Sequence, residues 1–316
     1  MIAIWLIATS IDLPPKPTKL DSPTIDLPID KRKEDPLVAL DKERKTVVQK
    51  LGEEPDEEGD VVQTGTSTVP TFPRLLGFVD GIQDGDIGSG VTEDGLVEYQ
   101  LVGLGIRTVS FLKIQVYVVG MYVATDDIAA LQEALIRRID PVATTLVAGE
   151  KEKLKQILLD PEHGEEIWSQ ILRDSGVRTL VRIVPTRDTD FGHLRDGWVR
   201  AITGRARKNP EEFGDDAFGA SVNNFKALFR RGSVPKKKEL LLARNEKGVL
   251  AIWYDDGKGS PQRLGDVQDE RISRAVWLNY LAGKTVASEP ARVSIVDGVM
   301  EFVERPVGTV ATQVHV

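Results

Sequence analysis

The chain has 316 residues, 41% of them hydrophobic, so it is long enough to form a substantial core and a separate tail. A formal net charge of −8 argues against a protein that binds the phosphate backbone of nucleic acids, because such proteins concentrate positive charge. The absence of cysteine excludes disulfides, thiolate nucleophiles and sulfur-ligated metals. With only three histidines, the composition also argues against a histidine-rich metal site.

The first eight residues are apolar, but they fall short of the roughly 20 needed to cross a bilayer and lack the basic flank of a signal peptide. Two interpretations stay open: a hydrophobic chain end, or the remnant of a longer membrane or targeting segment that would give membrane association. Residues 11–69 contain no aromatic residue, and prolines and charge clusters recur there, so they cannot offset the entropy of folding. We expect a disordered segment at 1–60 and one domain at 61–316.

The predicted elements of that domain begin with β-type residues at 61–62 and 69–72. Two long strands follow at 97–108 and 113–124, rich in β-branched and aromatic residues, and they form a hairpin in which Tyr117 lies on the more polar face of the second strand. Further elements are expected in chain order: helices at 126–139 and 165–173, a strand at 178–184, helices at 189–207 and 218–229, strands at 239–244 and 249–254, and helices at 269–282 and 290–304. Strands paired as hairpins favour an α+β fold, an antiparallel sheet with a layer of helices packed on one face.

Two separated motifs carry a family resemblance. The run 103–122 has a Gly-x-Gly-x-Arg strand end followed by a strand that closes in Gly-x-Tyr, and it resembles the opening hairpin of the chalcone isomerase-like fold. The segment 189–197, Thr-Asp-Phe-Gly-His-Leu-Arg-Asp-Gly, is similar to the fungal mitochondrial branch, the altered-inheritance-of-mitochondria proteins. The resemblance covers the chain from about residue 61 onward. It implies a mitochondrial protein, at the inner membrane or in the intermembrane space.

In plant chalcone isomerases a strand arginine, a threonine on the next strand, and a tyrosine and an asparagine on a helix shape the pocket. The resemblance places Arg107 at the arginine position, where a fixed positive charge suits a phenolate or another anion. The alternative is a structural ion pair with one of the many acids. Tyr117 replaces the threonine, and Phe191 and Trp198 fall near the helix positions. Because phenylalanine donates no hydrogen bond, the resemblance argues against chalcone cyclisation, and Arg107 and Tyr117 are catalytic only if the chain is an enzyme.

His193 is the candidate metal ligand. Gly197 lies one helical turn after it, so the surface beside the imidazole lacks a side chain there, and a flat ligand could rest between Phe191 and Trp198. A neutral imidazole is an ordinary axial ligand of haem iron. The alternative is a capping or hydrogen-bonded histidine.

The resemblance thus leaves three outcomes: a haem-binding protein, a fatty-acid-binding protein, or an intramolecular lyase acting on an enone. Our first hypothesis is a pocket protein for a small hydrophobic or planar ligand, haem or fatty-acid-like. In either case Arg107 would meet the ligand's carboxylates by bidentate hydrogen bonds. The rival hypothesis is the lyase, with Arg107 and Tyr117 holding a phenolate.

Overall fold

The computed structural model describes residues 49–50, 60–79, 96–230, 232–258 and 260–304. The chain divides into two units, residues 1–42 and 43–316, and every described element belongs to the second. Most of the expected N-terminal segment, and the Gly/Asp-rich stretch at 80–95, lie outside the described residues. A domain boundary at residue 61 therefore remains a prediction.

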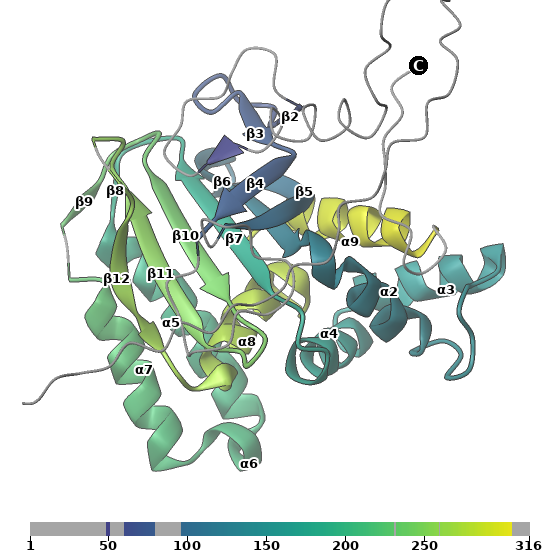
Figure 1. The fold of residues 1–316 in the computed structure, drawn as a ribbon. Helices are drawn as coiled ribbons and strands as arrows, with labels where there is room; N and C mark the ends of the chain where they lie inside the picture. Colours follow the sequence, from purple (N-terminus) through teal and green to yellow (C-terminus); the bar gives the residue numbers. More distant parts are fainter. Residues whose placement is uncertain (1–48, 51–59, 80–95, 231, 259, 305–316) are drawn as a thin grey trace, which may run out of the picture. The chain divides into compact units, whose positions relative to one another are not determined.

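One large sheet forms the centre of the described fold (Figure 1). Its strands lie in the order β1 (Gln49–Lys50), β4 (Leu75–Phe78), β5 (Val97–Val109), β6 (Ile114–Ala124), β7 (Thr179–Pro185), β10 (Glu239–Arg244), β11 (Leu250–Asp255) and β12 (Gln262–Val267). All neighbours pair antiparallel except β1 and β4, which pair parallel. Two small sheets join β2 (Val61–Gln63) to β3 (Thr71–Pro73) and β8 (Thr189–Asp190) to β9 (Ser233–Val234).

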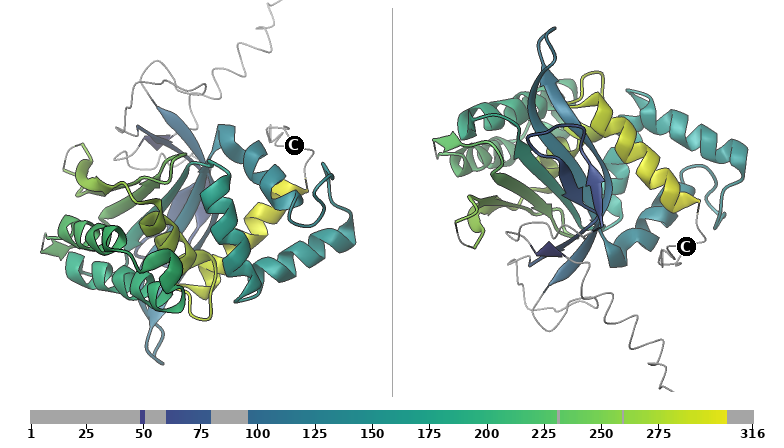
Figure 2. Two further views of the ribbon diagram at one scale, coloured as in Figure 1. Left: turned by 90° about the horizontal axis from the view of Figure 1, so that it is seen from below. Right: turned by 90° about the horizontal axis from the view of Figure 1, so that it is seen from above.

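The helices gather on one face of this sheet (Figures 1 and 2). They are the 3₁₀ helix η1 (Thr125–Asp127) and α2 (Ile128–Ile136), α3 (Ala148–Leu159), α4 (His163–Asp174), α5 (Phe191–Lys208), α6 (Pro210–Phe213), α7 (Asp216–Leu228), α8 (Glu270–Leu281) and α9 (Glu289–Val303). Val119, Met121 and Val123 of β6 join their core, whereas Val118 and Tyr122 point to the opposite face, as the two-residue period of a strand requires. The predicted α+β fold, with an antiparallel sheet and helices on one face, is confirmed.

Helix α3 and strand β12 are the longest of the elements that were not predicted from the sequence. Helix α3 buries only Leu154 and Leu158 fully, and the rest of it is largely charged, so its apolar periodicity is weak. Strand β12 has no fully buried residue except Val267 and contains Gly265 at a φ of 142°, where a bulge interrupts its pairing with β11. Both elements owe their position to tertiary contacts more than to local pattern.

Helix α9 lies directly against β5 beyond the point where β4 ends. β4 pairs with β5 only through residues 97–100, and α9 covers the same strand edge further on. There the amide of Leu104 donates to Ser294 Oγ (3.1 Å) and Ser288 Oγ donates to the carbonyl of Ile106 (2.9 Å). Side-chain hydroxyls of the helix thus satisfy backbone groups that a neighbouring strand would otherwise pair.

Glycines make this close approach possible. A Cβ at Gly103 would lie 2.5 Å from the backbone of Ser294 and Ile295, and a Cβ at Gly298 would overlap the carbonyl oxygen of Val102. Such distances leave no room for a side chain, so the helix and the strand touch backbone to backbone. The spacing of α9 from the sheet therefore depends on these residues lacking side chains.

We predict that Gly298→Ala lowers the free energy of unfolding by at least about 2 kcal/mol, because the new methyl group must push α9 away from β5. Urea unfolding followed by circular dichroism measures the change. Gly204→Ala is the matched control: it lies in α5 with no heavy atom within 4 Å of the added Cβ, and should stabilise by about 0.5–1 kcal/mol. Equal behaviour of the two variants would contradict the packing argument.

Candidate functional site

Arg107 and Tyr117 lie opposite each other across the β5–β6 hairpin. Arg107 is half-buried, and its Nη1 donates to the carbonyl of Ala287, just before α9, at 2.6 Å. Tyr117 is 5% exposed and belongs to the core on the helix side. Among the described residues no carboxylate forms an ion pair with Arg107, so the structure shows no salt bridge of the kind we considered as the alternative. Within the described ranges, the partner of its positive charge is the neutral carbonyl of Ala287.

A short hydrogen-bonded chain continues from Tyr117 into the helices. Tyr117 Oη lies 3.2 Å from Oη of Tyr280 in α8, and the indole Nε1 of Trp198 in α5 donates to the same Tyr280 oxygen at 2.8 Å. All three side chains are at most 5% exposed. The two phenols hold two protons and their mutual contact uses one, so within the described part of the chain one hydroxyl proton has no acceptor. A ligand oxygen beside Arg107 could accept it.

The two phenols resist ionisation. Burial raises the pKa of Tyr117, against the opposing effects of the Arg107 charge and of the hydrogen bond between Tyr117 and Tyr280. Burial also raises the pKa of Tyr280 well above its usual value, and the neighbouring Tyr117 adds to the shift, whereas Trp198 and Arg107 oppose it. Both tyrosines are therefore neutral at physiological pH. They act as hydrogen-bond donors and not as bases.

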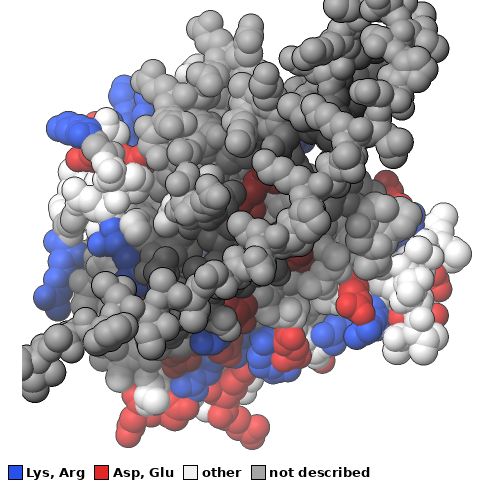
Figure 3. All heavy atoms as spheres, viewed as in Figure 1, with Lys and Arg blue, Asp and Glu red and all other residues white. Residues whose placement is uncertain are grey.

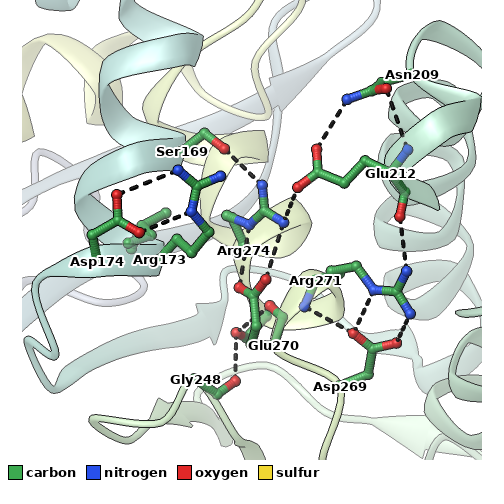
Figure 4. A network of polar contacts seen from close by, with 12 residues as sticks. Ser169, Arg173, Asp174, Asn209, Glu212, Gly248, Asp269, Glu270, Arg271 and Arg274 are labelled. Carbon is green, nitrogen blue, oxygen red and sulfur yellow. Dashed lines mark hydrogen bonds and ion pairs between the residues drawn. The ribbon is translucent and has the colours of Figure 1, made fainter.

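Helix α8, which carries Tyr280, is held at both ends. Near its start the buried Arg274 binds Glu270, Glu212 of α6 and Ser169 Oγ of α4, the last at 2.8 Å (Figure 4). At its end Arg205 Nη2 donates to the carbonyls of residues 278 and 282 at 2.9 and 3.0 Å. Charge-assisted bonds of this kind cap the last carbonyls of a helix. These contacts fix the position of α8 along its axis, and with it the position of the Tyr280 hydroxyl relative to Tyr117.

The α5 residues expected at the site divide between two faces of the helix. Phe191 and Trp198 are 1% and 2% exposed and point into the core, whereas the His193 side chain is 81% exposed. A Cβ at Gly197 would meet nothing within 4 Å, so this glycine lies on the open side with His193. The expectation that Phe191 and Trp198 flank a strip beside the imidazole is thus corrected. At 3.6 residues per turn, positions 191 and 198 share one face and positions 193 and 197 share another.

His193 has a structural environment at the start of α5. Asp190 caps the helix by accepting from the backbone amide of His193 at 2.8 Å, and its other oxygen lies 2.5 Å from Nδ1 of the imidazole. The imidazole is 81% exposed, and no group of three metal-ligating side chains is found among the described residues. A porphyrin held through His193 would have no enclosing walls, so the residues present do not fit haem ligation there.

The structure has a groove elsewhere, between β5 and α9. It measures about 670 Å³ and is lined by residues 100–104, by the side of α9 that carries Glu289 and Asp297, and by Arg74. Asp297 is paired with Lys155, and Arg74 with Asp60. This groove does not include Arg107, Tyr117 or His193. Arg107 and His193 therefore do not face a common cavity as expected, because Tyr117, Phe191 and Trp198 pack in the core between sheet and helices whereas the His193 side chain faces solvent.

We predict that Tyr280→Phe lowers the free energy of unfolding by about 1–3 kcal/mol, because the buried Trp198 indole N–H loses its acceptor. Tyr117→Phe should cost less, since Tyr280 still accepts from Trp198 in that variant. Chemical unfolding of the three proteins side by side provides the measurement. A Tyr117→Phe variant at least as damaging as Tyr280→Phe would show that the indole bond is not the important one.

We also predict that stability falls as the pH rises above 10. In the folded protein, burial raises the pKa of Tyr117 and of Tyr280 above the ordinary tyrosine value of 10.0, so their contribution is complete below pH 10 and is lost as the pH rises toward the folded values. Unfolding free energies measured across this range give the slope. The double variant Tyr117→Phe/Tyr280→Phe should have a shallower slope than the parent; an unchanged slope would contradict the assignment.

Comparison with known proteins agrees with this fold. Residues 97–296 match the family described as "Chalcone isomerase like". The protein named "Altered inheritance of mitochondria protein 18, mitochondrial" from Debaryomyces hansenii is 36% identical over 203 residues, 64% of this chain and 66% of that one. Its namesake from Eremothecium gossypii is 32% identical over 237 residues, 73% of this chain and 77% of that one. The expected resemblance to mitochondrial relatives is confirmed.

Among solved structures, the Arabidopsis thaliana fatty-acid binding protein AtFAP1 superposes with a TM-score of 0.52 at 16% identity, over 78% of this chain and 100% of that one. At this identity the likeness shows the fold alone. No helix within the described ranges has the length and apolar character to span a membrane. Because the family match spans residues 97–296, more than half of its length, the chain belongs to the chalcone isomerase-like family.

Proposed function

We propose that this chain binds a fatty-acid-like ligand whose carboxylate is held by Arg107 and the hydroxyl of Tyr117. The observation that carries the proposal is the half-buried guanidinium of Arg107, which has no acidic partner among the described residues and lies beside two neutral phenols. A carboxylate supplies the missing negative charge and accepts the spare hydroxyl proton. The name of the structural neighbour AtFAP1, a fatty-acid binding protein, agrees with this ligand class.

The hydrogen bonds at Arg107 and Tyr117 favour binding of an anion over catalysis of a reaction. Arg107 is always charged and offers several N–H donors, one of which already binds the Ala287 carbonyl and so orients the group. Trp198 donates to Tyr280, which in turn contacts Tyr117, so the hydroxyl of Tyr117 is held in place. In surroundings poor in water these donors bind a carboxylate more strongly than they would at the surface.

The rival lyase reaction needs a further donor at the α5 positions of Phe191 and Trp198, and neither side chain offers one. Trp198 Nε1 is committed to Tyr280, and Phe191 packs its ring against Tyr254 with centroids 5.1 Å apart. A phenyl ring cannot donate to an enone oxygen. The proposal is therefore binding without turnover. Haem is not part of it, because His193 faces solvent and pairs with Asp190.

We predict that Arg107→Gln weakens binding of a fluorescent fatty acid such as cis-parinaric acid by about 10- to 100-fold, because the carboxylate of the ligand loses a charge-assisted hydrogen bond. Titration of the purified full chain, followed by fluorescence, gives the dissociation constant. Arg200→Gln is the matched control, since Arg200 lies exposed on α5 and should leave affinity unchanged. The methyl ester of the same acid should bind the parent weakly and Arg107→Gln equally weakly.

Two results would contradict the proposal. One is equal affinity of the parent for the acid and its methyl ester, since the ester lacks the charge that Arg107 is expected to bind. The other is saturable loss of chalcone absorbance that Arg107→Ala abolishes. That result would establish the lyase reading in place of a binding protein.

A further inference from the structure

The turn of the β5–β6 hairpin has an apolar tip. Residues 110–113 connect the strands, and the amide of Lys113 donates to the carbonyl of Ser110 at 3.2 Å. Ser110 and Lys113 have φ values of 62° and 50°, in the left-handed region. These two residues bend the chain so that Phe111 and Leu112 form its outermost corner.

Phe111 and Leu112 are 92% and 68% exposed. The strand residues just behind them, Val109 and Ile114, are 39% and 36% exposed. In Figure 2 the hairpin projects beyond the rest of the sheet in both views. Single exposed apolar residues are ordinary, but four contiguous ones at the end of a projecting hairpin form a patch that water does not favour.

Several cations lie at the same end of the sheet as this tip. Lys113 is in the turn itself, Arg187 follows β7, and Lys236 to Lys238 precede β10, where Lys237 N donates to the carbonyl of Pro185 at 2.9 Å. None of these five forms an ion pair with a described residue. Pro185 is the register partner of Tyr117, about 10 Å along the strand from Ile114 at roughly 3.3 Å per residue. Figure 3 shows Lys and Arg side chains at the upper left, where the start of β10 lies in Figure 1.

We propose that the tip formed by Val109, Phe111, Leu112 and Ile114 inserts into the interfacial region of an anionic lipid bilayer, with the surrounding cations facing the headgroups. Phe and Leu side chains gain by leaving water for the acyl boundary, and each Lys or Arg near the surface adds attraction to anionic lipid. A protein partner fits these observations less well. A stable protein interface buries about 800 Å² on each side, which four side chains on a narrow hairpin cannot supply.

This inference is independent of the proposed ligand, although the two sites are near each other. Arg107 and Tyr117 occupy the same hairpin: Arg107 lies two residues before Val109 in β5, and Tyr117 lies three residues after Ile114 in β6. Insertion of the tip would therefore bring the Arg107 end of the sheet close to the lipid surface. Failure of either idea leaves the other standing, because the tip residues do not contact Arg107 in any bond the structure shows.

The first test uses the absence of cysteine in the chain. Phe111→Cys and Val142→Cys each give a single labelling position for an environment-sensitive fluorophore. Val142 is 89% exposed in the loop after α2, away from the hairpin, and is the matched control. With vesicles of phosphatidylcholine and phosphatidylserine we expect a blue shift at position 111 and none at position 142. The readout is local, so lipid binding by another part of the full chain does not mimic it.

The second test measures binding of the unlabelled full chain by vesicle flotation. Phe111→Ser/Leu112→Ser should weaken binding to the anionic vesicles by about tenfold or more, whereas Val142→Ser should not. Arg187→Gln/Lys236→Gln should also weaken binding, and added salt should reduce this difference. The charge control is Lys153→Gln/Lys208→Gln, which removes two exposed cations from α3 and α5.

Three outcomes would overturn the proposal. An equal spectral response at positions 111 and 142 would show that the tip does not insert. Equal binding to vesicles of phosphatidylcholine alone would remove the role of the cations. Self-association that the Phe111→Ser/Leu112→Ser variant abolishes, seen by sedimentation without lipid, would make the tip a protein contact instead.

Discussion

The backbone contact between α9 and β5 is the constraint on which the described site depends. Gly103 and Gly298 let the helix lie where a neighbouring strand would otherwise run, and Ser294 completes the hydrogen bonding of that strand edge. The same placement sets the Ala287 carbonyl, just ahead of the helix, against the guanidinium of Arg107. A helix displaced by one methyl group would move the only hydrogen-bond partner that the structure shows for this cation.

The other contacts of the site depend on how the β5–β6 hairpin packs against helices α5 and α8. The register of the hairpin puts Arg107 and Tyr117 side by side. The fixed position of α8 along its axis brings the Tyr280 hydroxyl to that of Tyr117. Burial keeps both phenols protonated, while the nearby positive charge partly counters that effect. The result is a cation and a hydroxyl donor held together without an acid between them. This arrangement favours an incoming anion over proton abstraction, since neither phenol is available as a base.

Local pattern predicted the β5–β6 hairpin, because strand alternation is a property of neighbouring residues, and the family resemblance pointed to Arg107 and Tyr117 on it. It did not predict Tyr280, which reaches the site only through the packing of α8. His193 was wrongly predicted to face a ligand pocket. Its spacing from Gly197 shows that the two residues share a face of α5, but this spacing does not show whether that face is buried. The apolar spacing of Phe191, Leu194, Trp198 and Ile202 carries that information, and their burial bears it out. This apolar spacing predicts that His193 lies on the solvent-exposed face of the helix.

An unpaired guanidinium in a half-buried position is costly to keep, since partial desolvation removes water without supplying a counter-charge. A neutral carbonyl such as that of Ala287 offsets only part of this cost. The chain nevertheless contains more acidic than basic residues, and none of the described acids reaches Arg107. Among the acids in the described ranges, it is the local packing around Arg107 that keeps a carboxylate from pairing with it. A ligand with an anionic head would then gain the attraction that the fold itself leaves unused.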